Sequence, residues 1–124
     1  MNIKLKPELK NLYKLNDFIL KSTSKKNLHI DLMVEEIFVN IVNYSGADYI
    51  CVNTNYTDNI LSVEFIDNGF EFNPLLKESV NIPSNIEEAQ IGGLGIHLTK
   101  QLADTIDYSR INGENHLKIT KKVE

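Results

Sequence analysis

The spacing of apolar residues along the chain predicts short strands and amphipathic helices. Ile3 and Leu5 alternate with lysines, as in a short edge strand. Apolar residues then recur at helical spacing after Pro7, a residue that suits the first turn of a helix. A second helix is predicted over Leu28–Tyr44, and Gly46 is positioned to end it.

The second half of the chain is rich in strand-forming residues. Val, Ile and aromatic residues mark strands over residues 49–56, 60–67, 105–111 and 116–120. A third helix is predicted from near residue 94 to near residue 104. The element order β-α-α-β-β-loop-α-β-β predicts an α/β (α+β) two-layer sandwich. In such a fold a mixed, mostly antiparallel sheet carries its helices on one face.

Residues 68–90 show no hydrophobic period and contain Pro74, Pro83 and many polar residues. Loops longer than about 12–15 residues are uncommon in compact domains and are often lids, binding loops or disordered segments. A long loop in a chain of 124 residues therefore marks a candidate functional segment.

Composition narrows the possible functions. The chain is of single-domain length, 1–124, and carries a formal net charge of −4. Arg110 is the only arginine among 13 basic residues, so the basic patch of a nucleic-acid binder is absent. Cys51 is the only cysteine, which excludes an internal disulfide and favours a reducing compartment. With no apolar run of ~18 residues and no signal-peptide core, a cytoplasmic protein is expected.

The helix predicted over Leu28–Tyr44 carries a narrow polar stripe. Glu36, Asn40 and Asn43 follow one another at steps of four and three, which places them within about 60° around the helix. Apolar residues flank the stripe, and burying unpaired polar groups costs about 1–3 kcal/mol each. The stripe therefore either binds a ligand or simply meets water.

Two glycine-containing segments allow similar alternatives. Asp67-Asn68-Gly69 follows an apolar strand and is either a plain Asx-turn or a place where a flat ligand lies against the chain. Gly92-Gly93-Leu94-Gly95 opens the third helix, where free backbone N–H groups favour an anion such as phosphate. A flexible loop is the alternative for these glycines.

Taken in this chain order, the three features resemble the ATP-binding domain shared by DNA gyrase, MutL and sensor histidine kinases, the GHKL or Bergerat fold. The resemblance is closest to its stand-alone branch, the anti-sigma-factor serine/threonine kinases. VEEIFVNIVNY is similar to the N-box of that branch, DNGFEFNP to its first glycine box and GGLGIHLTKQLADTIDY to its second. The likeness spans nearly the whole chain.

The resemblance implies a role for each matching residue. Asp67 would accept a hydrogen bond from the adenine amino group, and Gly69 would let the base lie against the chain. Asn40 would coordinate Mg²⁺ at the ATP phosphates, and Glu36 would be the general base. The remaining implied nucleotide contacts, beside a lid at about 70–91, are Asn43, Phe72, Gly92, Gly93, Leu94, Gly95 and Ile96.

The function implied by the resemblance is an ATP- and Mg²⁺-dependent serine/threonine protein kinase. Its substrate would be a small STAS-type anti-anti-sigma protein, and a sigma factor is a possible second partner, as is a second copy of the chain. An ATP-dependent binding switch without kinase activity is the alternative. A third alternative is a nucleotide-binding subunit of a larger signalling complex.

Overall fold

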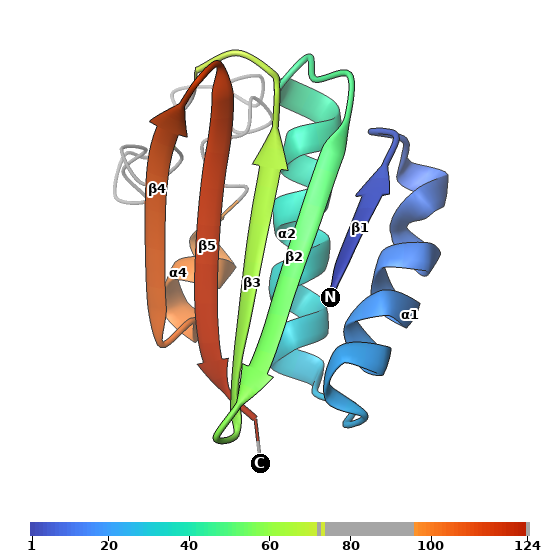
Figure 1. Ribbon diagram of the computed structural model, residues 1–124, viewed down its shortest axis with the longest axis vertical. Helices are drawn as coiled ribbons and strands as arrows, with labels where there is room; N and C mark the ends of the chain where they lie inside the picture. Colours follow the sequence, from blue (N-terminus) through green and yellow to red (C-terminus); the bar gives the residue numbers. More distant parts are fainter. Residues whose placement is uncertain (72, 74–95, 124) are drawn as a thin grey trace, which may run out of the picture.

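The computed structural model describes residues 1–71, 73 and 96–123 (Figure 1). They form five strands, a short 3-10 turn and three α-helices in the predicted order. The elements are β1 (Asn2–Leu5), η1 (Leu9–Asn11), α1 (Leu12–Thr23), α2 (Leu28–Tyr44), β2 (Ile50–Thr57), β3 (Ile60–Asp67), α4 (His97–Leu102), β4 (Thr105–Ile111) and β5 (Glu114–Lys122).

The strands form one sheet in the order β1-β2-β3-β5-β4. Each neighbouring pair in this sheet is antiparallel, so the prediction of a mixed sheet was wrong in that detail. The chain passes from β3 through α4 to the edge strand β4 and returns as β5 beside β3. This return sets Asp67, the last residue of β3, directly opposite Asn115 of β5.

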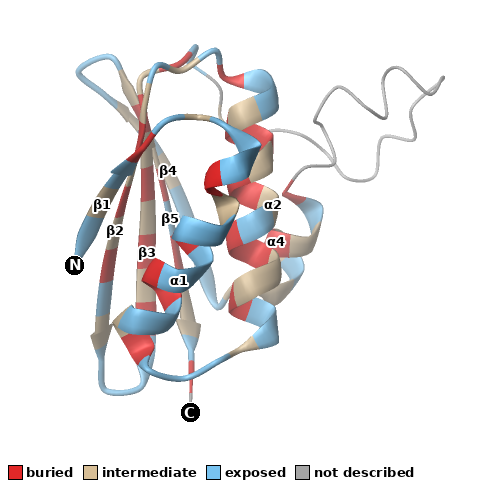
Figure 2. Cartoon of the chain, turned by 90° about the vertical axis from the view of Figure 1, so that its right-hand side faces the viewer, coloured by how far each residue is buried: buried red, intermediate tan, exposed pale blue. Residues whose placement is uncertain are grey.

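All three α-helices cover the same face of the sheet, as predicted (Figure 2). In Figure 1, α2 lies behind the middle of the sheet, with α1 beside β1 and α4 behind β4 and β5. Buried and partly exposed residues alternate along β2 and β3, because successive side chains point to opposite faces of a strand. The two-layer sandwich is therefore confirmed.

The core lies between the sheet and the helices α1 and α2. Burial of a large apolar side chain contributes roughly 1.5–3 kcal/mol, so this layer supplies much of the driving force for folding. Its largest fully buried side chains are Leu15, Met33, Ile37, Phe38, Ile50, Leu61, Phe65 and Ile119. Because α2 contributes to this core along most of its length, its position on the sheet is firmly set.

Local signals set the element ends. Oδ1 of Asn27 accepts a hydrogen bond from the Ile30 amide at 3.0 Å and so caps the start of α2. The hairpin turn between β4 and β5 uses Asn112 and Gly113, both at positive φ, as a tight hairpin requires. The last strand is longer than predicted, and the start predicted for the third helix near residue 94 lies outside the described residues.

Candidate functional site

The polar stripe of α2 runs from the interior to the surface. Asn40 is buried, with 7% of its surface exposed, whereas Glu36 is half-buried and Asn43 is exposed. The alternative that the stripe simply meets water therefore holds for Asn43 but not for Asn40.

Asn40 carries a buried polar atom that nothing in the described residues satisfies. Its Oδ1 is the only buried side-chain nitrogen or oxygen there without a hydrogen-bond partner. An unsatisfied acceptor of this kind costs about 1–3 kcal/mol. An amide oxygen is a ligand that Mg²⁺ accepts, so Asn40 fits the implied metal. In the described part of the chain no group of three His, Cys, Asp or Glu side chains is arranged to hold a metal ion.

Asn40 and Asp67 line one small cavity between α2 and the sheet. The cavity has a volume of about 30 Å³, roughly the room that two water molecules need. Its wall is formed by Ile37, Asn40, Ile41, Tyr44, Ser45, Asp67, Tyr108, Asn115 and Leu117. The fold thus brings together two residues that lie 27 positions apart in the sequence. The family resemblance assigns Asn40 to the metal ion and Asp67 to the adenine ring.

Asp67 ends β3 as a buried carboxylate with 4% of its surface exposed. Its Oδ1 accepts hydrogen bonds from the Gly69 amide at 2.9 Å and from Asn115 Nδ2 at 3.1 Å. The Gly69 bond closes an Asx-turn, which confirms the structural interpretation of Asp67-Asn68-Gly69. A contact between Asp67 and adenine stays a prediction.

Asn115 is the central residue of this network, and the sequence did not reveal it. Its Nδ2 also donates to the Phe70 carbonyl at 2.7 Å, while its Oδ1 accepts from the Tyr108 hydroxyl at 2.6 Å. Arg110, the only arginine, donates to the same Oδ1 at 3.1 Å and to the Gly69 carbonyl at 2.9 Å. The predicted strand began at His116, so the inward-facing position one residue earlier went unnoticed.

The group that lies close against Gly69 is Ser45 of the protein itself. A Cβ at this position would lie 2.3 Å from the Ser45 carbonyl oxygen and 2.7 Å from the Ser45 Cβ. The Phe70 amide donates to that same carbonyl at 2.9 Å. Packing against the end of α2 therefore already requires glycine at position 69, which is a reason that the sequence did not give. A ligand contact at Gly69 stays a prediction.

Glu36 is held at the first turn of α4. Its Oε1 accepts a hydrogen bond from the Thr99 amide at 2.7 Å and a second from the Thr99 hydroxyl. Its Oε2 accepts from the Leu98 amide at 3.1 Å. These donors join the middle of α2 to the helix that follows the glycine-rich segment.

The other predicted contacts are placed differently or fall outside the described residues. Ile96 is 2% exposed and belongs to the hydrophobic core, so its side chain packs inside the protein. A nucleotide contact at Ile96 stays a prediction. The predicted contacts that lie outside the described residues are Phe72, Gly92, Gly93, Leu94 and Gly95.

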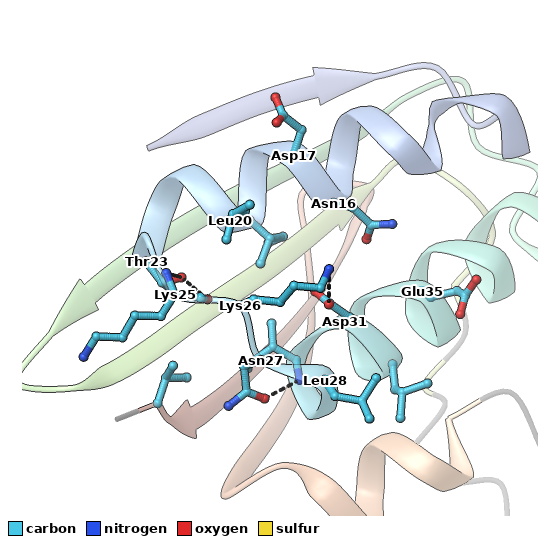
Figure 3. Close-up of a pocket in the computed structure, with 14 residues that line it drawn as sticks. Asn16, Asp17, Leu20, Thr23, Lys25, Lys26, Asn27, Leu28, Asp31 and Glu35 are labelled. Atoms are coloured by element: carbon cyan, nitrogen blue, oxygen red, sulfur yellow. Dashed lines mark hydrogen bonds and ion pairs between the residues drawn. The ribbon is translucent and has the colours of Figure 1, made fainter.

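A larger hollow of about 410 Å³ lies between α1 and the beginning of α2 (Figure 3). Lys26 and Asp31 form an ion pair there at 3.4 Å, and the side chain of Asn27 is used to cap α2. None of Glu36, Asn40 and Asp67 lines this hollow. It is therefore separate from the candidate site.

In the described residues, no helix has both the length and the apolar character needed to cross a membrane.

Among curated proteins, the chain is similar to the serine/threonine-protein kinase BtrW of Bordetella bronchiseptica, with 26% identity over 88% of this chain and 81% of that protein.

Solved structures share the fold at lower sequence identity. The histidine kinase AdeS of Acinetobacter baumannii has a TM-score of 0.58 at 12% identity, covering 100% of this chain and 68% of that chain. The nucleotide-free catalytic domain of the histidine kinase ThkA has a TM-score of 0.57 at 13% identity, covering 99% of this chain and 97% of that chain. The family described as histidine kinase-like ATPase domain matches residues 15–121. The chain therefore belongs to the family of histidine kinase-like ATPase domains, as its resemblance to GHKL proteins predicted.

Proposed function

We propose that this ATPase domain is a serine/threonine protein kinase of the anti-sigma type, which transfers the γ-phosphate of ATP to a small STAS-type protein. The observation that carries the proposal is the cavity shared by Asn40 and Asp67, in which the Asn40 oxygen is buried without a partner. An unsatisfied acceptor beside a buried carboxylate is costly in a purely structural site. The similarity to the kinase BtrW supports the choice of serine or threonine as acceptor.

The roles of the residues follow from their chemistry. Asp67, a hydrogen-bond acceptor, would select the adenine amino group. Asn40 would hold Mg²⁺, and Glu36, one helical turn before Asn40, would take the proton of the attacking hydroxyl. Mg²⁺, when bound, neutralises charge that develops on the phosphates. The protein then contributes mainly by positioning the reactants, so few catalytic side chains are needed.

A second candidate function is an ATP-dependent binding switch without phosphotransfer. The observation that favours it is the engagement of Glu36, whose two oxygens both accept hydrogen bonds from the start of α4. A carboxylate in that position acts as a structural cap. In this alternative, Glu36 joins α2 to α4 and does not take part in chemistry.

The test is capture of partners by the tagged chain from its own cell lysate with Mg-ATP, followed by phosphopeptide mass spectrometry. The catalytic variant is Glu36→Gln, and its matched control is Glu35→Gln, an exposed neighbour on the same helix. We expect a small partner with a new phosphoserine or phosphothreonine in the wild type and the control but not in Glu36→Gln. Capture of an unmodified partner that depends on ATP would contradict the kinase and support the binding switch.

The same capture addresses the proposed partners. A STAS-type protein should be recovered as the phosphorylated species, and a sigma factor as an unmodified one. A second copy of the chain is a further proposed partner, which light scattering of the purified protein would detect. No direct contact with nucleic acid or membrane is proposed.

A further inference from the structure

We infer that Thr99 is a positioning residue whose hydroxyl holds the Glu36 carboxylate in place for proton transfer. The inference rests on the proposed function, because it assigns Thr99 to the base of that reaction. Thr99 is 0% exposed, so its hydroxyl is shielded from water. This hydroxyl donates a hydrogen bond to Oε1 of Glu36.

The hydrogen bonds distinguish the two oxygens of Glu36. Among the described residues, Oε1 receives both the Thr99 hydroxyl and the Thr99 amide, whereas Oε2 receives only the Leu98 amide at 3.1 Å. Each carboxylate oxygen can accept about two hydrogen bonds. Oε1 is therefore saturated, and Oε2 retains an acceptor position. The geometry points to Oε2 as the atom that takes the proton from the attacking hydroxyl.

The hydroxyl of Thr99 matters because Glu36 is half-buried and long. A glutamate side chain is among those with most rotamer freedom, so a fixed carboxylate needs an anchor. The backbone amides of Leu98 and Thr99 supply part of that anchor whatever their side chains are. The hydroxyl adds a charge-assisted hydrogen bond, a stronger kind than a neutral one. It also decides which oxygen is saturated.

Two conservative substitutions separate this role from packing. Thr99→Val removes the O–H group and keeps the branched shape and the backbone amide. Thr99→Ser keeps the O–H group and removes a methyl. If Thr99 served only packing in the core, Thr99→Ser would be the more harmful change. If it positions Glu36, Thr99→Val would be the more harmful one.

The first readout is the NMR resonance of the Glu36 side-chain carboxyl carbon in the nucleotide-free protein, assigned by its absence in Glu36→Gln. It should shift in Thr99→Val and return toward the wild-type value in Thr99→Ser. The second readout is hydrolysis of Mg-ATP, in which water replaces the protein hydroxyl as the acceptor of the γ-phosphate and ADP is released. Thr99→Val should lower kcat about tenfold, as expected for a misplaced catalytic group, with an unchanged KM for ATP. Thr99→Ser should restore kcat.

The double variant completes the test. In the Glu36→Gln background, Thr99→Val should have no further effect on kcat, because both changes act through one group. An unshifted Glu36 resonance in Thr99→Val overturns the inference, and so does an unchanged or raised kcat when Glu36→Gln is inactive. A fully active Glu36→Gln protein would instead overturn the assignment of the base in the proposed function.

Discussion

Asp67 and Asn115 meet across two strands as residues paired in register, with Asn115 Nδ2 donating to Asp67 Oδ1 at 3.1 Å. The same oxygen accepts from the Gly69 amide at 2.9 Å. The internal contacts of Asp67 are therefore made through one acceptor atom, which an asparagine also has. This allows the structural role of residue 67 to be separated from the predicted binding role.

Asp67→Asn should weaken ATP binding while leaving the fold nearly intact. The side-chain oxygen of the introduced asparagine can accept both internal hydrogen bonds, so the free energy of unfolding should change by less than about 1 kcal/mol. Loss of a charge-assisted hydrogen bond of about 1.5–3 kcal/mol should weaken ATP binding roughly tenfold to hundredfold. Titration calorimetry measures the affinity. Equal affinities for the two proteins would show that Asp67 does not contact adenine.

Asn115→Ala is the complementary change. It removes the side chain that links Asp67, Phe70, Tyr108 and Arg110, so it should lower the free energy of unfolding by about 2–3 kcal/mol. Asn55→Ala, at an exposed position of β2, is the matched control and should change stability by less than about 0.5 kcal/mol. Similar losses in both variants, measured by urea unfolding, would contradict a central role for Asn115.

Asn40→Leu should stabilise the nucleotide-free protein and abolish its response to Mg-ATP. The substitution removes a buried acceptor that has no partner in the described residues, for a gain of about 1 kcal/mol. Thermal unfolding with and without Mg-ATP measures both effects. Asn43→Leu, on the exposed part of the same stripe, controls for the stability of the nucleotide-free state. A less stable Asn40→Leu protein would mean that the amide is satisfied after all.

Gly69→Ala should be destabilising by about 2–3 kcal/mol, because the new Cβ would lie 2.3 Å from the Ser45 carbonyl oxygen. Gly113→Ala is a control of a different kind. Its φ of 81° strains an alanine, but a Cβ there meets no atom within 4 Å, so it should cost only about 1–2 kcal/mol. Chemical unfolding should show the larger loss for Gly69→Ala. The reverse order would contradict the close contact with Ser45.

The stability of the protein should depend on Tyr49 at alkaline pH. The Tyr49 hydroxyl donates to the Glu114 carboxylate, and this hydrogen bond, with partial desolvation and the Glu114 charge, raises the pKa of Tyr49 from 10.0 to about 12. A raised pKa favours the neutral form in the folded state. The contribution of Tyr49 to stability is therefore complete below pH 10.0 and is lost as the pH rises toward about 12.

Phenolate absorbance as a function of pH, with Tyr49→Phe as the reference for subtraction, measures this pKa. In Glu114→Gln, Tyr49 should titrate closer to 10.0, because the carboxylate charge is gone. Tyr13→Phe, at a residue that is 68% exposed, is the matched control. An unchanged titration of Tyr49 in Glu114→Gln would refute the role of Glu114.

Local patterns in the sequence were enough to predict the elements and the polar stripe. Hydrophobic period, helix stops and turn residues act over a few positions, so the helix over Leu28–Tyr44 and the strand over Ile60–Asp67 were predicted at their observed bounds. The stripe of Glu36, Asn40 and Asn43 depends only on helix geometry. The family resemblance supplied the expectation that the ligand is a nucleotide, because motifs in a fixed chain order carry more information than composition.

Which groups meet in space depends on the assembled fold. Asn115 lies opposite Asp67 because β5 inserts between β3 and β4, and strand order and register are long-range properties that no local pattern reports. The contact of Glu36 with Thr99 joins residues 63 positions apart, and it depends on how α4 is placed beside α2. The packing of Ser45 against Gly69 is likewise a contact between elements that no local pattern reports. Side-chain partners across elements follow from packing, which the fold as a whole determines.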